Sequence, residues 1–509
     1  MNLRRLEVLG LAIGLFLSVQ LSYIHPDEHF QSLEVLAWRF FGINGAIPWE
    51  FQSETAARSF VPLLLNYGPL FCVFKATKVD NPLVILRLVR IQNYLTFIAT
   101  SRYVMKRLYG AFSAKWCNFF IATSYISGCF QSHSFSNSFE TIVLLIVLAL
   151  YNELLPHVRD HKTQAYKISC LLGFLISLGC FNRITFPAFI LFPSLVVFWR
   201  FFRTHQGPLA LLLVSSTVSS LVFILIDTRM YQSNGLTVAP LRNLLYNFDE
   251  ANLEKHGLHP RYHHILVNLP QMLGPAILLT NPRRHNFKNS SRGLVISAIA
   301  SGMLFLSIFR HQELRFLLPL GPLLFACLNP NASIASINSA FIIKLWLVFN
   351  VILGTIYGVY HQGGVLKVLG RFQEQKAVGV HVWWKTYSPP TWMYMNKELV
   401  VSTTMLEQGI ETVDQIPFEA ISNHVIDLKG CADGLLNSTL HSFLENGANV
   451  KLIAPDSLAG RLDSLQRSGS LTLTPSDRIS GHLDLDHLDI SDLSTFQPGI
   501  SVYSVELSR

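Results

Sequence analysis

The sequence predicts a mostly helical protein that crosses a membrane many times and ends in a small soluble α/β domain. Half of the 509 residues are hydrophobic and only 14% are charged, whereas soluble domains carry about a quarter charged residues. The mean hydropathy is +0.35. Apolar runs of roughly 17 to 22 residues, the length that crosses a hydrocarbon core, recur along the chain.

The N-terminal segment predicts an uncleaved signal anchor. Arg4 and Arg5 precede an apolar stretch over residues 6–24, and no small-residue cleavage site follows it. Basic residues beside a first span favour the cytoplasmic side. We therefore expect a cytoplasmic N-terminus, with a first loop over residues 25–82 on the far side.

Two apolar pieces of this first loop are expected near the membrane surface. Phe30, Leu33, Leu36 and Phe40 recur at helical spacing, and Gly42 closes the pattern, which predicts an amphipathic helix. Residues 60–74 are apolar but contain two prolines and a glycine. This stretch is expected to be interfacial or re-entrant, because a full span here would invert every later loop.

About ten further apolar runs bring the expected number of spans to about eleven. If the spans alternate from a cytoplasmic N-terminus, almost all short basic clusters fall on one side, as the positive-inside rule requires. The polar, aromatic and acidic loops then converge on the opposite side. The runs are 83–101, 112–130, 139–155, 168–182, 184–199, 208–226, 264–281, 293–309, 315–328 and 340–360.

The net charge of +8 divides unevenly along the chain. From Glu407 onward there are 15 acids and 6 bases, which leaves 34 bases and 17 acids before that point. These bases lie between apolar runs rather than in one patch, so they are explained by membrane topology and not by nucleic-acid binding. The seven cysteines are scattered and contain no CxxC pair, so they indicate no disulfide framework.

The chain is expected to divide at the end of the apolar runs. We predict a membrane domain over residues 1–365, a connecting segment over 366–400 and a soluble α/β domain over 401–509. Within the last, residues 424–428 and 449–454 are expected to be strands, and residues 435–444 and 457–465 helices.

The strongest candidate for chemistry is the segment Ser22–Gln31, called here the acidic decad. It places Asp27 and Glu28 directly after the first span, where carboxylates are costly and mark functional sites. One of them is a candidate general base; the alternative is that both only stabilise a helix N-terminus. His25 and His29 are four residues apart, but Pro26 disfavours one continuous helix, so we expect no metal site.

Two later segments are candidates for binding a substrate. Residues 309–316 contain His311, Glu313 and Arg315 between two spans. They could clamp a lipid-linked phosphate, or the arginines could extend to the lipid headgroups. Arg183 has the same two interpretations. His256 and His259 lie in a long loop and are expected to bind sugar or phosphate, or to be solvated. Because the chain has no Walker A and no GxGxxG motif, we expect a donor delivered within the membrane.

These segments also carry a family resemblance. His25-Pro26-Asp27-Glu28 after a signal anchor, and His311-Gln312-Glu313-Leu314-Arg315-Phe316, resemble motifs of the dolichyl-phosphate-mannose-dependent mannosyltransferases, although Gln312 replaces the usual lysine. Further matching segments are similar to the members that act in the glycosylphosphatidylinositol (GPI) pathway and add a fourth mannose. They are residues 239–247, 252–264, 267–271, 134–140, 361–365 and 384–392.

The resemblance implies a GT-C membrane architecture in the endoplasmic reticulum, with a lumenal active site. It implies inverting transfer of mannose from dolichyl phosphate mannose to the 2-hydroxyl of the third mannose of a GPI precursor glycolipid, with no metal and no other cofactor. Asp27 is then the expected base and Glu28 its neighbour in catalysis. The expected substrate-binding residues are His25, His29, Arg183, Asn243, Tyr246, Asn247, His256, His259, His311, Glu313 and Arg315.

Other functions remain open at this stage. A related mannosyltransferase, for the third GPI mannose or the N-glycan precursor, would share the fold but should lack the motif at residues 252–264. A lipid transporter would place ionisable residues in mid-span, and a metallohydrolase would use His25 and His29. Besides the lipid bilayer and the two lipid-linked substrates, no protein partner is indicated, and no nucleic acid is expected.

Overall fold

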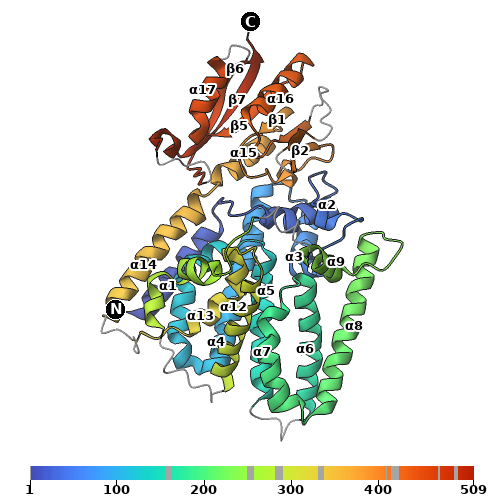
Figure 1. Cartoon of the computed structure of the whole chain (residues 1–509), viewed down its shortest axis with the longest axis vertical. Coiled ribbons are helices and arrows are strands. Elements are labelled where there is room, and N and C mark those ends of the chain that lie inside the picture. The colour runs from blue at the N-terminus through green and yellow to red at the C-terminus, as the bar shows by residue number, and fades with distance from the viewer. Residues whose placement is uncertain are drawn as a thin grey trace. The chain divides into compact units, whose positions relative to one another are not determined.

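The structure is a computed structural model that describes residues 2–155, 162–248, 257–280, 290–330, 338–407, 410–413, 423–467, 471–485 and 491–508. It contains two compact units (Figure 1). Unit 1 comprises Met1–Ser18, Pro48–Pro69 and Val89–Gly354. Unit 2 comprises Val19–Ile47, Leu70–Leu88 and Thr355–Arg509. The first-loop segment 19–47 therefore groups with the C-terminal part of the chain and not with the membrane helices that follow it.

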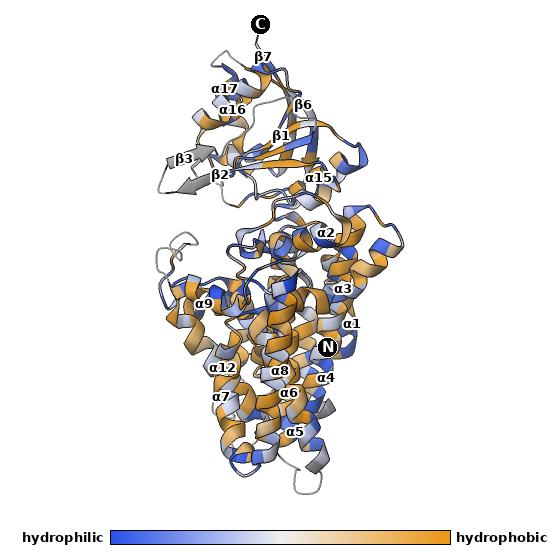
Figure 2. Cartoon of the chain, turned by 90° about the vertical axis from the view of Figure 1, so that its right-hand side faces the viewer, coloured by the Kyte–Doolittle hydropathy of each residue, from blue (hydrophilic) through white to orange (hydrophobic). Residues whose placement is uncertain are grey.

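Unit 1 is a bundle of helices, most of which follow the predicted apolar runs. Hydrophobic residues predominate along its helices (Figure 2). Among the described residues, the α-helices within it are α1 (Leu3–Ser18), α5 (Ser136–Leu154), α6 (Lys162–Asn182), α7 (Pro187–Val197), α8 (Gln206–Met230), α9 (Ala239–Phe248), α11 (Leu269–Leu273), α12 (Ser290–Ile308), α13 (Gly321–Ala326) and, except for its last residue, α14 (Ser339–Thr355). Short 3-10 and π-helical turns link several of them.

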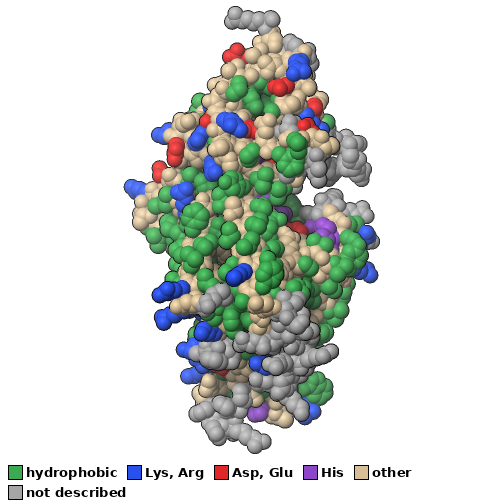
Figure 3. All heavy atoms as spheres, turned by 90° about the vertical axis from the view of Figure 1, so that its left-hand side faces the viewer, with side chains coloured by type: hydrophobic (Ala, Val, Ile, Leu, Met, Phe, Trp, Pro, Cys, Tyr) green, Lys and Arg blue, Asp and Glu red, His purple; other side chains and the backbone are tan. Residues whose placement is uncertain are grey.

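The bundle is built to face lipid. Six helices in the described residues are long and apolar enough to cross a membrane, and four shorter apolar helices accompany them. Within the α8 span only 6% of residues are buried in the protein, so most of its apolar surface needs a lipid environment. Apolar side chains on α1 and α14, such as Val8 and Val351, are likewise exposed. Hydrophobic side chains cover much of the face of the molecule in Figure 3. The total of about eleven spans stays a prediction.

Two predicted boundaries differ in detail from the structure. Residues 60–74 form one continuous helix, α3 (Phe60–Ala76), that contains Pro69. The runs 83–101 and 112–130 are joined in α4 (Pro82–Thr123), which kinks at Gly110. Gly110 has a φ of 76°, a left-handed conformation that glycine adopts without steric cost. The two runs are therefore separated by a kink rather than by a loop.

Unit 2 is organised around a seven-stranded mixed sheet of order β3-β2-β4-β1-β5-β7-β6. Strands β1, β2, β4 and β5 pair in parallel, and the other pairs are antiparallel. The predicted strands 424–428 and 449–454 correspond to β4 and β5, and the predicted helices to α16 and α17. The bounds are β1 (Gly379–Trp383), β2 (Val400–Glu407), β3 (Ile410–Val413), β4 (Asn423–Asp427), β5 (Val450–Pro455), β6 (Leu471–Ser480), β7 (Gly499–Leu507), α15 (Gly363–Glu374), α16 (Asp433–Glu445) and α17 (Ala459–Arg467).

The sheet begins earlier than the predicted boundary at residue 401. Strand β1 lies in the expected connecting segment 366–400, yet it pairs with both β4 and β5 at the centre of the sheet. Its Val380 and Val382 are fully buried, and α16 packs Leu436 and Leu440 into the same core. The segment is therefore part of the folded unit and not a linker.

Candidate active site

The acidic decad begins a helix, as expected, and presents its two carboxylates differently. Asp27 and Glu28 open the helix, a π-helical turn over His29–Leu33 follows, and α2 (Glu34–Phe41) continues to Gly42 in the left-handed conformation. The Asp27 side chain is 24% exposed, whereas that of Glu28 is fully buried. π-Helical turns are uncommon in proteins, and those that occur are often found at functional sites.

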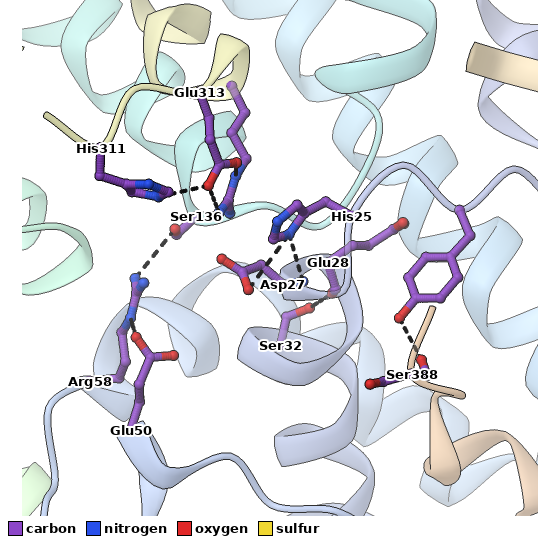
Figure 4. Close-up of polar contacts among 12 residues, drawn as sticks. His25, Asp27, Glu28, Ser32, Glu50, Arg58, Ser136, His311, Glu313 and Ser388 are labelled. Atoms are coloured by element: carbon purple, nitrogen blue, oxygen red, sulfur yellow. Dashed lines mark hydrogen bonds and ion pairs between the residues drawn. The ribbon is translucent and has the colours of Figure 1, made fainter. Parts of the chain in front are cut away.

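Asp27 is held beside His25. The backbone N–H of Asp27 donates to Nδ1 of His25 at 3.1 Å, and the Asp27 carboxylate lies 3.6 Å from the same nitrogen (Figure 4). Both side chains are partly exposed. The arrangement leaves Asp27 accessible, while its position at the positive end of the helix favours the ionised form.

His29 is buried among aromatic side chains of unit 2. Its Nε2 atom lies 3.8 Å from the Glu28 carboxylate, and its Nδ1 atom accepts a hydrogen bond from the indole N–H of Trp392 at 3.2 Å. Tyr23 packs edge-on against the imidazole ring at 5.0 Å and donates its hydroxyl to the Ser388 carbonyl at 2.8 Å. His29 is thus enclosed within the protein rather than directed to solvent.

A short connection after β1 forms this enclosure. Residues 384–395, called here the strap, include the 3-10 turn Thr391–Tyr394. The backbone N–H of Trp392 donates to Glu34 at 3.1 Å, and the Thr391 hydroxyl donates to the other oxygen of that carboxylate. Burial raises the pKa of Glu34 to about 7 despite these hydrogen bonds. The strap therefore connects α2 to the central strand of the sheet.

The segment 361–365 fixes the start of the decad. The backbone N–H of Tyr23 donates to the His361 carbonyl at 3.0 Å, and Nδ1 of His361 lies 3.0 Å from the Tyr23 carbonyl. Gly364 approaches His482 and Ile500 so closely that a Cβ atom would lie 2.4 Å from Ile500. Three segments that carry the family resemblance, the decad, 361–365 and 384–392, therefore pack together in unit 2.

Three arginines of unit 1 are each paired with a glutamate. They lie in or beside loops that we expected on the same side of the membrane. Arg183 donates to Ser136 at 3.0 Å and pairs with Glu140 at 3.4 Å. Arg58 pairs with Glu50 at 3.0 Å and donates to the same serine at 3.4 Å (Figure 4). Sequence reasoning did not single out Arg58, because only the fold brings it to the loop at Ser136.

The third pair belongs to the predicted segment 309–316. Glu313 accepts from Arg315 at 3.0 Å and lies 2.9 Å from Nε2 of His311 (Figure 4). Burial lowers the pKa of His311, but the hydrogen bond and charge of Glu313 outweigh it, so the pKa is raised. Arg315 and Arg183 each lie 5.3 Å from the ring of Phe316, which places two guanidinium groups around one aromatic side chain.

Gln312, which replaces the usual lysine of this motif, has a structural role. Its side chain is buried. Its carbonyl oxygen accepts the backbone N–H of His264 at 2.8 Å, and its amide donates to the carbonyls of Arg261 and Phe309 at 3.2 and 2.8 Å. A lysine has no acceptor, so it could not satisfy the His264 N–H.

The remaining predicted binding residues lie in separate places of unit 1. On α9, Asn247 donates to the Asn243 side chain at 3.0 Å, and Tyr246 packs against Trp49 with ring centroids 4.3 Å apart. The backbone N–H of His259 donates to the Arg310 carbonyl at 2.7 Å. His256 lies outside the described residues, as do sequons Asn289 and Asn331. No group of three or more His, Cys, Asp or Glu side chains in the described residues has metal-binding geometry.

Sequence reasoning also missed two residues of the decad's surroundings. Trp392 was part of a matching segment, but nothing in the sequence indicated that its indole contacts His29. Glu34 follows the π-helical turn on an otherwise apolar helix face. The one signal in the sequence was the presence of an acid within this apolar pattern, because a carboxylate that becomes buried requires polar partners.

Comparison with known proteins places these groups in a functional context. Residues 8–396 match the Alg9-like mannosyltransferase family. A Saccharomyces cerevisiae protein named GPI mannosyltransferase 4 is 45% identical over 97% of this chain and 98% of its own length. Its namesake from Eremothecium gossypii is 42% identical over 99% and 100%.

Solved structures share the fold at low sequence identity. ArnT from Cupriavidus metallidurans in the apo state is 12% identical over 97% of both chains, with a TM-score of 0.53. The same protein bound to undecaprenyl phosphate gives 13% and 0.50 over the same coverage. This likeness confirms the fold of a polytopic membrane protein of GT-C type. With the family match over most of its length and close relatives over nearly all of it, the chain belongs to the Alg9-like mannosyltransferase family.

Proposed function

We propose that the protein transfers mannose from dolichyl phosphate mannose to the 2-hydroxyl of the third mannose of a GPI precursor, in an α-1,2 linkage. The observation that carries the proposal is the accessible Asp27 carboxylate, set at a helix N-terminus beside the buried Glu28. Full-length relatives named GPI mannosyltransferase 4 support the choice of acceptor.

The proposed step is a single displacement with inversion. The acceptor hydroxyl oxygen attacks C1 of the donor mannose and forms the new C1–O bond. Its proton passes to the Asp27 carboxylate, which acts as the general base. The bond from C1 to the phosphate oxygen breaks, and dolichyl phosphate leaves with the electron pair. Phosphate is a good leaving group, so the step requires one base and no strong acid.

The arginine pairs of unit 1 supply the chemistry that a lipid-linked phosphate needs. A guanidinium group presents a planar fork of N–H donors that matches phosphate oxygens. Arg183 and Arg315 flank Phe316, and each is held by a glutamate. We assign them to donor-phosphate recognition, with His311 as a third positive group when it is protonated.

The site of action follows from the same proposal. We place the protein in the endoplasmic reticulum membrane with a cytoplasmic N-terminus and with the decad on the lumenal side. The basic clusters between apolar runs support this orientation. The sequon at Asn437, on α16 of unit 2, is then lumenal, and those at Asn289 and Asn331 are cytoplasmic.

The test is a reconstituted transfer reaction. Purified protein receives dolichyl phosphate mannose and a GPI precursor with three mannoses, and the product linkage is determined with a linkage-specific α-mannosidase. An α-1,2-linked fourth mannose is the expected product, with undiminished rate in the presence of a metal chelator. Transfer only to a two-mannose GPI precursor or to an N-glycan precursor would assign the chain to a sister activity. Loss of activity on chelation would refute the metal-free step.

A further inference from the structure

In unit 2, Trp392 lies against His29 of the acidic decad. The hydrogen bond between the two side chains identifies which atom donates and which accepts. The indole N–H is a donor with no acceptor capacity. Because Trp392 donates to Nδ1 of His29 at 3.2 Å, that nitrogen must carry a lone pair. The imidazole proton of neutral His29 then resides on Nε2, the atom that lies 3.8 Å from the Glu28 carboxylate.

We propose that Trp392 is a positioning residue that fixes the tautomer of His29 and thereby keeps the buried Glu28 ionised beside the catalytic base. The proposal rests on the proposed function. An isolated buried carboxylate takes up a proton unless donors face it. The His29 Nε2–H lies 3.8 Å from this carboxylate, which is longer than a hydrogen bond but places the N–H dipole beside the charge. Because Glu28 is fully buried, its charge acts on Asp27 through space and not by contact with the sugar.

The strap is well anchored for this task. Trp392 is fully buried, its backbone N–H is fixed by Glu34, and its ring stacks on His29 with centroids 6.2 Å apart. Thr391 also accepts the backbone N–H of Ala46 at 2.8 Å. The indole therefore has little freedom to release His29, and the C-terminal sheet gains a role in catalysis without touching substrate.

The contact also opposes protonation of His29. A second proton on Nδ1 would point at the indole N–H, so the imidazolium form is disfavoured while Trp392 is present. Glu28 and Tyr23 are the titratable groups in described contact with His29, and Asp427, Tyr387 and Glu34 act on Tyr23 from other elements. Burial, with the charge of Glu28, keeps the Tyr23 pKa well above 10, so the hydroxyl stays neutral. Burial raises the pKa of Glu34 to about 7, so each variant's pH profile is compared with that of the wild type and of the matched control.

The experiment replaces the indole by a ring without a donor. We expect Trp392→Phe to lower kcat for mannose transfer roughly tenfold or more, as loss of orienting partners does at other sites, with donor and acceptor KM values within about threefold. Because His29 can then be protonated, the acid limb of the pH–rate profile should move to higher pH.

The matched control is Trp384→Phe. Trp384 begins the strap and is also buried, but its side chain packs into the sheet core and its indole donates to the Cys431 carbonyl at 3.1 Å. Its described contacts do not include His29. We expect this variant to lose a similar amount of stability and to keep the wild-type kcat and pH profile. If the two variants behave alike while the wild-type protein transfers mannose, the inference is wrong. If the wild-type protein transfers no mannose, it is the proposed function that fails.

A second pair of variants covers the case in which Trp392→Phe does not fold. His29→Gln keeps one acceptor and one donor, whereas His29→Leu has a similar size and neither. We expect the glutamine variant to retain at least tenfold more activity than the leucine variant. Equal activities would overturn the assignment, because they would show that the polarity of position 29 does not matter.

Discussion

Replacement of Asp27 by asparagine separates the two interpretations of the acidic decad. The substitution keeps the size of the side chain and removes the base. If Asp27 accepts the proton of the attacking hydroxyl, kcat should fall by about 10² to 10⁴, the usual contribution of a general base. This loss corresponds to about 3 to 5 kcal/mol of transition-state stabilisation.

The structure indicates that stability should change far less. The contact of Asp27 with His25 spans 3.6 Å, and the two side chains are 24% and 33% exposed. Ion pairs this accessible contribute about 0 to 1 kcal/mol, and an acid at a helix N-terminus contributes a similar amount. The free energy of unfolding should therefore fall by about 2 kcal/mol at most, less than the expected loss of transition-state stabilisation.

The assay measures mannose transfer and thermal unfolding of the same purified variants in detergent. Asp433→Asn is the matched control, because Asp433 also lies in the first turn of a helix and is 51% exposed, but its described ion pair is with Arg461 of α17 and not with the decad. It should lose similar stability and no activity. An Asp27→Asn variant with kcat within threefold of the wild type would refute the base assignment, and a severe loss confined to Glu28→Gln would transfer the role to Glu28.

Three further outcomes follow from the buried polar contacts. Glu34 has a pKa of about 7 in the folded protein against 4.5 unfolded, so its contribution to stability is fully present below pH 4.5 and is lost as pH rises through 7. The loss amounts to roughly 3 kcal/mol, and melting temperatures from pH 4 to 8 should fall more for the wild type than for Glu34→Gln. Glu313→Gln should lower the pKa of His311, because the hydrogen bond and charge of Glu313 raise it. It should also raise the donor KM roughly tenfold, since charge-assisted hydrogen bonds contribute about 1.5 to 3 kcal/mol. An unchanged KM below pH 6.5 would argue against donor binding at His311 and Arg315. Gln312→Lys should cost about 1 to 3 kcal/mol of unfolding free energy, because the buried N–H of His264 loses its acceptor, and unaltered thermal unfolding would contradict that role.

Sequence patterns predicted those features of the fold that depend on residues close together in the chain. Apolar runs located helices such as α5 and α8 within a few residues, and the left-handed Gly42 ends α2 as expected. The π-helical turn at His29–Leu33 was not foreseen, because one inserted residue per turn leaves little trace in a hydrophobic period. Strand β1 was missed as well, since a five-residue strand cannot be told from a linker without its partners.

The candidate site depends on contacts that no periodicity encodes. Trp392 and His29 are 363 residues apart, and Arg58 reaches Ser136 over 78 residues. Residue types alone identified the carboxylates, since acids beside a membrane require an explanation. They could not show that Glu28 is buried while Asp27 is accessible, because both occupy adjacent positions with the same chemistry.

The close packing of unit 2 explains why segments far from the carboxylates carry the family resemblance. Gly364 leaves no room for a Cβ atom beside Ile500 of β7, and His361 is hydrogen-bonded to the backbone of Tyr23. The strap holds His29 from another direction through Trp392. A substitution that breaks these contacts with the decad should displace it, and a displacement of about 1 Å at a catalytic group can lower the rate about 10²-fold. The C-terminal sheet is therefore better regarded as the support of the acidic decad than as an independent appendage.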